Sequence, residues 1–170
     1  MGETAGRSGK REGITLTPMR RRDKEIKDLG EIEEILRSAL VCRIALCDGN
    51  RPYCVPMIYC YDRGVMYLHS AKEGKKLEVL GRNNRICFEV EMDVDVVREG
   101  KPCAWTLRYK SVVGRGRAYI VEDPNEKRKA LECLVERVSP GYEYHFSDDE
   151  VESVVVIRIE VEEVSGKVSV

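Results

Sequence analysis

Apolar residues recur at helical spacing in three stretches of the chain. Asp28 and Glu31 stand three residues apart before the first stretch, and Asp123 with Pro124 opens the last; both pairs are typical of helix starts. The middle stretch is shorter, and Leu77 is one of its expected buried positions. The pattern predicts helices over about residues 29–39, 73–81 and 124–138.

Short runs rich in β-branched, aromatic and cysteine residues occupy most of the remaining chain and are typical of strands. Turn sequences at 48–49 and 62–64 predict that the first three runs form an antiparallel meander. Gly114 and Gly116 predict a bend or bulge in the long fifth run. The predicted strands cover residues 41–47, 53–61, 65–69, 85–91, 104–121 and 151–164, with connections over 92–102 and 139–149.

The strands follow one another too directly for a βαβ fold. The expected fold is mainly β, a six-stranded antiparallel barrel, closed or nearly closed, with the helices packed outside. Residues 1–18 are polar and rich in Gly, Ser, Lys and Arg, so we expect a disordered tail there. Residues 19–170 are expected to form one domain, as the length of 170 residues suggests.

Charge is balanced, since 29 Lys and Arg stand against 30 Asp and Glu, which argues against a protein that coats nucleic acid. The basic run at 20–22 is more simply interpreted as solvated surface. No run approaches the roughly 18 apolar residues of a membrane span, and the first residues lack the apolar segment of a signal peptide. We therefore expect a cytoplasmic protein that binds neither nucleic acid nor membrane.

The seven cysteines are odd in number and include no CxxC pair, and only two histidines accompany them. Without an export signal we expect no disulfide framework, and most cysteines should act as small apolar residues. We expect no metal site. One alternative stays open, because strands can bring irregular spacings together: a cluster of Cys42, Cys47, Cys54 and Cys60.

The junction between the third strand and the middle helix carries the most informative chemistry. Ser70 with Glu73 resembles a capping box, which predicts that the helix starts at Ser70. A helix start offers free backbone N–H groups and a partial positive charge to an anion, and Gly74 lets a ligand approach the backbone. The stretch is a candidate phosphate cradle; the alternative is an exposed helix with an ordinary cap. The cations that would join the cradle are Lys72, Lys75 and Lys76.

Two further features lie on the predicted strands. Proline cannot donate to a sheet ladder, so Pro56 predicts an edge strand or a bulge. Backbone groups of Val55, Met57 and Ile58 would then be free to pair with a flat heterocycle, unless the strand is simply an edge. Trp105, the only tryptophan, lies on a strand face that suits ring stacking or a dimer interface, although the core is the favoured interpretation.

Several catalytic signatures are absent from the sequence, namely GxGxxG, the P-loop, GxSxG and HExxH. Two histidines and no evident carboxylate pair leave few side chains for acid–base catalysis. A phosphate cradle with so few catalytic groups predicts that a bound cofactor supplies the reactivity.

The most specific motifs are Val55-Pro56 and the later His69-Ser70-Ala71-x-x-Gly74-x-Lys76. Supporting motifs lie at 42–46, 51–53, 109–116 and 122–124. In this order they resemble the flavin-binding split barrels related to pyridoxamine 5′-phosphate oxidase, and within them the 5-nitroimidazole-resistance (Nim-like) branch. The resemblance covers about residues 19–163, nearly everything except the tail.

The resemblance implies a six-stranded split-barrel homodimer with FMN, or FAD, in clefts at the dimer interface. The flavin ring would lie on the strand segment Val55–Ile58. His69 and Ala71 would lie beside the ribityl chain, with His69 as a candidate catalytic residue. Trp105 and Ser111 would reach the flavin, in part from the partner subunit. The residues implied for the phosphate are Ser70, Lys75 and Lys76.

Two departures from the family pattern stand out. Ile58 occupies a position where relatives often carry a small polar residue, and no residue marks a pyridoxal-phosphate pocket.

The resemblance implies an FMN-dependent oxidoreductase that takes a hydride from NAD(P)H and reduces a small acceptor such as a nitroaromatic or quinone. The alternatives are a non-catalytic flavin- or haem-binding module and a reductase of the same fold that uses the deazaflavin F420.

Overall fold

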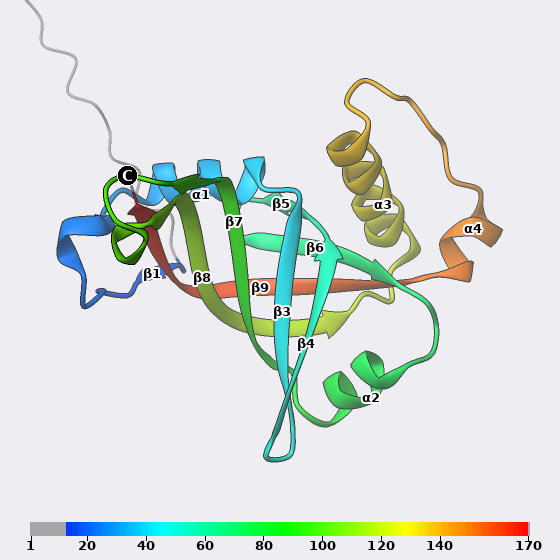
Figure 1. Ribbon diagram of the computed structural model, residues 1–170. Coiled ribbons are helices and arrows are strands. Elements are labelled where there is room, and N and C mark those ends of the chain that lie inside the picture. The colour runs from blue at the N-terminus through cyan, green and yellow to red at the C-terminus, as the bar shows by residue number, and fades with distance from the viewer. Residues whose placement is uncertain (1–12, 170) are drawn as a thin grey trace, which may run out of the picture.

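The computed structural model describes residues 13–169. In chain order the elements are β1 (Thr15–Leu16), η1 (Arg22–Lys24), β2 (Glu25–Ile26), α1 (Leu29–Ser38), β3 (Val41–Asp48), β4 (Arg51–Ile58), β5 (Cys60–Asp62), β6 (Val65–Ser70), α2 (Lys75–Arg82), β7 (Arg85–Val97), η2 (Pro102–Ala104), β8 (Thr106–Ile120), α3 (Pro124–Val138), α4 (Asp148–Ser153) and β9 (Val155–Ser169). The predicted mainly β fold with peripheral helices is confirmed (Figure 1).

One curved sheet contains all nine strands of the described chain, rather than the predicted six. Its main path runs β4-β3-β7-β8-β9-β6-β5, and every pair on this path is antiparallel. β1 and β2 add to β9, β1 in parallel and β2 antiparallel. The path does not close on itself, so β4 and β5 are its two edges, as in a barrel that is split open along one seam.

The core lies inside the curve of the sheet, where α1 covers it. Fully buried side chains from the helix and the strands meet there, among them Ile32, Leu36, Ile44, Phe88 and Ile157. The Tyr59 hydroxyl donates to the Leu36 carbonyl oxygen at 2.6 Å inside this core. A second apolar cluster joins α3 and α4 to β5 and β9. The domain therefore has two apolar contact regions on one sheet.

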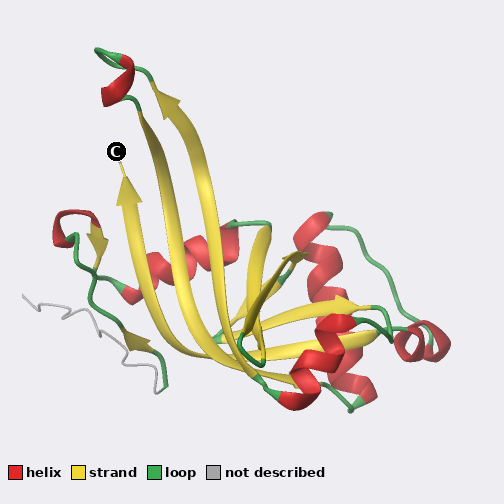
Figure 2. Cartoon of the chain, turned by 60° about the horizontal axis from the view of Figure 1, so that its bottom comes forward, coloured by secondary structure: helices red, strands yellow, loops and turns green. Residues whose placement is uncertain are grey.

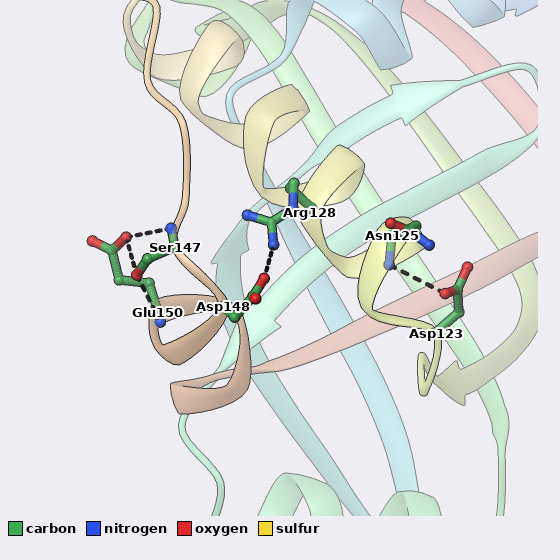
Figure 3. Close-up of polar contacts among 6 residues, drawn as sticks. All are labelled: Asp123, Asn125, Arg128, Ser147, Asp148 and Glu150. Carbon is green, nitrogen blue, oxygen red and sulfur yellow. Dashed lines mark hydrogen bonds and ion pairs between the residues drawn. The ribbon is translucent and has the colours of Figure 1, made fainter.

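Helix caps explain where the outer helices begin (Figure 3). The Asp123 carboxylate accepts from the first free N–H groups of α3, so the predicted helix over 124–138 is confirmed. Ser147 and Glu150 form a reciprocal capping box at the start of α4, whose residues sequence analysis assigned partly to a connection and partly to the last strand. Arg128 of α3 bonds Asp148 of α4 at 2.5 Å and joins the two helices.

Three predicted strands differ clearly in extent from the observed ones, and the last of them, predicted over 151–164, is β9 at Val155–Ser169. The strand predicted over 53–61 divides at Tyr59 into β4 and β5. β7 continues to Val97, because its pairing with β8 resumes beyond an irregularity between Met92 and Asp95. Together β7 and β8 form a hairpin that extends beyond the rest of the sheet and carries η2 at its tip (Figure 2). Most of the predicted connection over 92–102 is therefore strand.

The amino-terminal prediction can be compared only in part, since residues 1–12 lie outside the described residues. From residue 13 onward the chain is placed against the sheet, and Thr15 and Leu16 pair with Glu163 and Val164 of β9. Residues 13–18, which the predicted tail included, therefore belong to the described structure. None of the helices within residues 13–169 is long and apolar enough to cross a membrane.

Candidate functional site

β4 is an edge strand, as the proline in its middle predicted. Within the described chain it pairs only with β3, and Pro56 stands opposite Arg43. Its side chains alternate: Val55 and Met57 pack against the core, while Pro56 and Ile58 point outward and are exposed. The backbone edge that faces away from β3 is the seam of the split sheet. A planar group with hydrogen-bonding edges could lie against it.

The end of β6 differs from the prediction at Ser70. Ser70 is still in the strand, paired with Val155 of β9, and is buried, so it does not cap a helix. α2 begins five residues later, at Lys75, directly after Gly74, whose φ of 130° is a conformation that favours glycine. The predicted helix cap at Ser70 was wrong because strand alternation directs this side chain inward. His69, by the same alternation, is exposed, while Ala71 and Lys72 lie in the exposed connection.

The first turn of α2 presents two lysines with different surroundings. Lys75 is engaged: its Nζ lies 3.3 Å from Asp48 Oδ2 and 5.1 Å from the centre of the Tyr53 ring. Lys76 is partly buried, and burial lowers its pKa. Within residues 13–169 no salt bridge involves Lys76. A partly desolvated cation with no protein carboxylate beside it, at a helix start, is suited to hold an anion.

An apolar cleft of about 410 Å³ has Ile58 of β4 and His69 of β6 in its wall, and none of the α2 lysines lines it. Its volume falls in the range of small-molecule sites. The opposite wall comes from α3, α4 and the segment between them, which sequence analysis did not connect with the site. The sequence predicts only an apolar stripe on this helix and gives no signal of a cleft, because the exposure of Val135 and Val138 depends on the fold. The additional lining residues include Leu131, Leu134, Val135, Val138, Phe146 and Glu150.

Trp105 and Ser111 do not join the other predicted site residues within one chain. Both lie on the β7–β8 side, and β3 and β7 stand between β8 and β4 in the sheet. Trp105 is 46% exposed, with the Arg98 guanidinium 5.8 Å from its ring centre, so the favoured core location for this side chain is wrong. Ser111 is half-buried and pairs with Glu91 and Lys167 across the sheet.

The four cysteines considered as a cluster are divided by burial. Cys42 and Cys60 are buried, whereas Cys47 and Cys54 are exposed on the opposite face of the first hairpin. Burial raises the pKa of Cys42 to about 12, as expected for an inert core thiol. In residues 13–169 no group of three His, Cys, Asp or Glu side chains is arranged to hold a metal ion.

The family model for pyridoxamine 5′-phosphate oxidase matches residues 28–168. The chain belongs to the pyridoxamine 5′-phosphate oxidase-like family. The match spans both edges of the sheet, α2 and the long strands, so the predicted resemblance is confirmed over nearly the whole domain. No curated protein sequence matches the chain significantly.

Solved structures agree with this family assignment. A candidate 5-nitroimidazole antibiotic resistance protein from Bacteroides thetaiotaomicron shares 34% identity at a TM-score of 0.75, covering 85% of this chain and 86% of its own. An FAD-binding protein from Mesorhizobium loti shares 25% identity at a TM-score of 0.63, covering 84% and 96%. An FAD- and haem-binding protein from Mycobacterium smegmatis shares 18% identity at a TM-score of 0.78, covering 86% and 73%, and supports the fold.

Proposed function

We propose that this member of the pyridoxamine 5′-phosphate oxidase-like family binds a flavin at the seam between β4 and the end of β6. The observation that carries the proposal is Lys76, partly buried and without a salt bridge in the described chain, at the start of α2 beside an open strand edge. The family and the FAD-binding relative from Mesorhizobium loti support a flavin. FMN is the form we favour, with FAD as the alternative.

The chain offers a separate group for each part of such a ligand. The β4 edge at Val55–Ile58 would pair with the ring, and Lys76 with the free N–H groups of α2 would hold the phosphate. Lys75 can contribute only if it leaves Asp48, and buried Ser70 contributes less than its sequence suggested. Lys72 and Ala71 would lie at the mouth.

A second subunit would complete the site. The β7–β8 hairpin carries exposed apolar residues that a monomer would leave in water, and it carries Trp105 and Ser111 far along the sheet from β4. A homodimer would cover this surface and bring both residues to the flavin of the partner. The exposed apolar residues are Val94, Val96, Trp105 and Leu107.

The activity we propose is NAD(P)H-dependent reduction of a small acceptor such as a nitroaromatic or quinone. A bound flavin supplies the hydride transfer that the side chains cannot. The protein's part is to orient the reactants and exclude water: apolar Ile58, Leu131 and Leu134 would shield an acceptor, and His69 would donate to it.

The test compares Lys76→Met with a matched control, Lys129→Met. Lys129 is an exposed lysine of α3. A hydrogen bond to a charged group contributes about 1.5–3 kcal/mol, so loss of Lys76 should weaken FMN binding roughly 10- to 150-fold. Fluorescence quenching of FMN measures the affinity.

The wild type should also be yellow when purified and bleach anaerobically on addition of NADH or NADPH. A colourless protein that refuses added FMN would end the proposal.

His69 favours one second candidate, a haem-binding module. Its exposed imidazole lies in the wall of an apolar cleft, and imidazole is a common axial ligand of haem iron. Titration with haemin should then give a Soret band that His69→Ala abolishes. A reductase that uses F420 is distinguished by competition between F420 and FMN for the same site.

A further inference from the structure

Two of the seven cysteines interact across the contact between β5 and α3. Cys60 lies on β5 and Cys133 on α3, and each thiol shifts the pKa of the other. The Cys60 sulfur also lies 3.9 Å from the carbonyl oxygen of Ala130, one helical turn before Cys133. Both cysteines belong to the second apolar cluster. Two cysteines 73 positions apart in sequence thus lie within one apolar contact between β5 and α3.

The two thiols differ in exposure and in acidity. Cys60 is 2% exposed, whereas Cys133 is half-buried. The neighbouring Cys133 thiol and burial raise the pKa of Cys60, while the Cys60 thiol lowers the pKa of Cys133, although burial opposes that second shift. A half-buried sulfur beside a fully shielded thiol is the arrangement of a reacting and a resolving cysteine.

We propose that Cys133 and Cys60 form a peroxide-sensitive dithiol that oxidises to a disulfide between α3 and β5. The Cys133 thiolate attacks one oxygen of hydrogen peroxide, the O–O bond breaks, and hydroxide leaves as Cys133 becomes a sulfenic acid. The Cys60 sulfur then attacks the Cys133 sulfur, the S–O bond breaks, and the departing hydroxide takes the Cys60 proton. The two sulfurs lose two electrons together, and one peroxide becomes two waters.

The remaining cysteines lack this arrangement. Cys47, Cys54 and Cys103 are exposed, Cys42 is sealed in the main core, and Cys87 is half-buried on β7. Cys87 therefore matches Cys133 in exposure without a thiol donor beside it. The disulfide would also fix one wall of the apolar cleft, because Leu131 and Leu134 flank Cys133 on α3.

The experiment treats the purified full-length protein with hydrogen peroxide, blocks free thiols under denaturing conditions, and maps the peptides by mass spectrometry. The wild type should show a Cys60–Cys133 cross-link, two fewer free thiols than the seven of the reduced protein, and full recovery with dithiothreitol. Cys87→Ser should behave like the wild type. Cys60→Ser should form no cross-link and should accumulate a dimedone-trappable sulfenic acid at Cys133.

Several outcomes would overturn the proposal: no Cys60–Cys133 cross-link in the wild type, oxidation of Cys133 to a sulfinic acid while Cys60 stays free, or reaction of Cys87 as fast as Cys133. The wild-type mapping decides even if a serine variant fails to fold, and Cys133→Ser gives a second variant at the more exposed position. The mapping requires no bound flavin. If no cross-link forms, the proposed flavin binding is unaffected, and if the protein binds no flavin, the proposed disulfide is unaffected.

Discussion

Gly114 lies where three strands of the sheet are closely packed. It stands on β8 between Phe88 of β7 and Val164 of β9. A Cβ atom at this position would lie 2.3 Å from Phe88 Cζ and 2.9 Å from the Glu163 carbonyl oxygen. Phe88 is fully buried and cannot turn away, and the carbonyl is held by the sheet. Gly114→Ala therefore overpacks the core rather than filling a space.

The expected cost follows from that overlap. Inserting a methyl group into a well-packed core costs about 1–3 kcal/mol. For a chain of this length about 1 kcal/mol corresponds to roughly 2–4 °C, so the midpoint should fall by roughly 2–12 °C. Urea and thermal unfolding followed by circular dichroism measure both quantities. Gly81→Ala is the matched control: no atom lies within 4 Å of the new Cβ, and the helix should gain about 0.5–1 kcal/mol.

A double variant identifies the cause of the loss. Phe88→Leu removes the Cζ atom and should restore part of the stability that Gly114→Ala costs, but not all, because the Glu163 carbonyl remains. The reasoning is refuted if Gly114→Ala unfolds like the wild type. It is equally refuted if the losses of the two substitutions simply add.

Three further predictions concern single side chains. Tyr59→Phe leaves the Leu36 carbonyl without its buried donor, so urea unfolding should show a loss of about 1–3 kcal/mol. Asp123→Ala removes the cap of α3 and should cost about 0.5–2 kcal/mol in the same assay, whereas Asp123→Asn should retain most of it. Burial lowers the pKa of Lys76, so the unfolded chain binds its proton more tightly. Lys76→Met should therefore be as stable as the wild type or more so at neutral pH, and any advantage should vanish as pH rises past the ordinary value of 10.5; a stability loss at neutral pH contradicts this.

Local sequence signals were sufficient where one short motif decides the structure. Asp28 and Asp123 each cap a helix at the predicted place, because a side chain near the helix start satisfies its first N–H groups. Pro56 marked β4 as an edge because proline has no N–H to donate. These signals, with the motif order, were enough for the fold class and the family.

Other features depend on contacts between distant parts of the chain. Ser70 has the sequence of a cap, yet its pairing with Val155 keeps it in a strand and moves the helix start to Gly74. β7 extends through a charged segment because β8 pairs with it. The cleft beside His69 requires α3 and α4 to lie against the end of β6, which no local pattern indicates. Candidate residues could thus be named from sequence, but their grouping could not.

β9 follows every other described element in the chain, yet β1, β2, β6 and β8 all pair with it. During synthesis those four strands therefore emerge from the ribosome before their common partner exists. Native topology must wait until this strand is released, which makes the nascent chain dependent on protection from aggregation until then. A premature stop codon shortly before residue 155 should yield a product without the middle of its sheet. We expect that product to be degraded, not to fold with reduced stability.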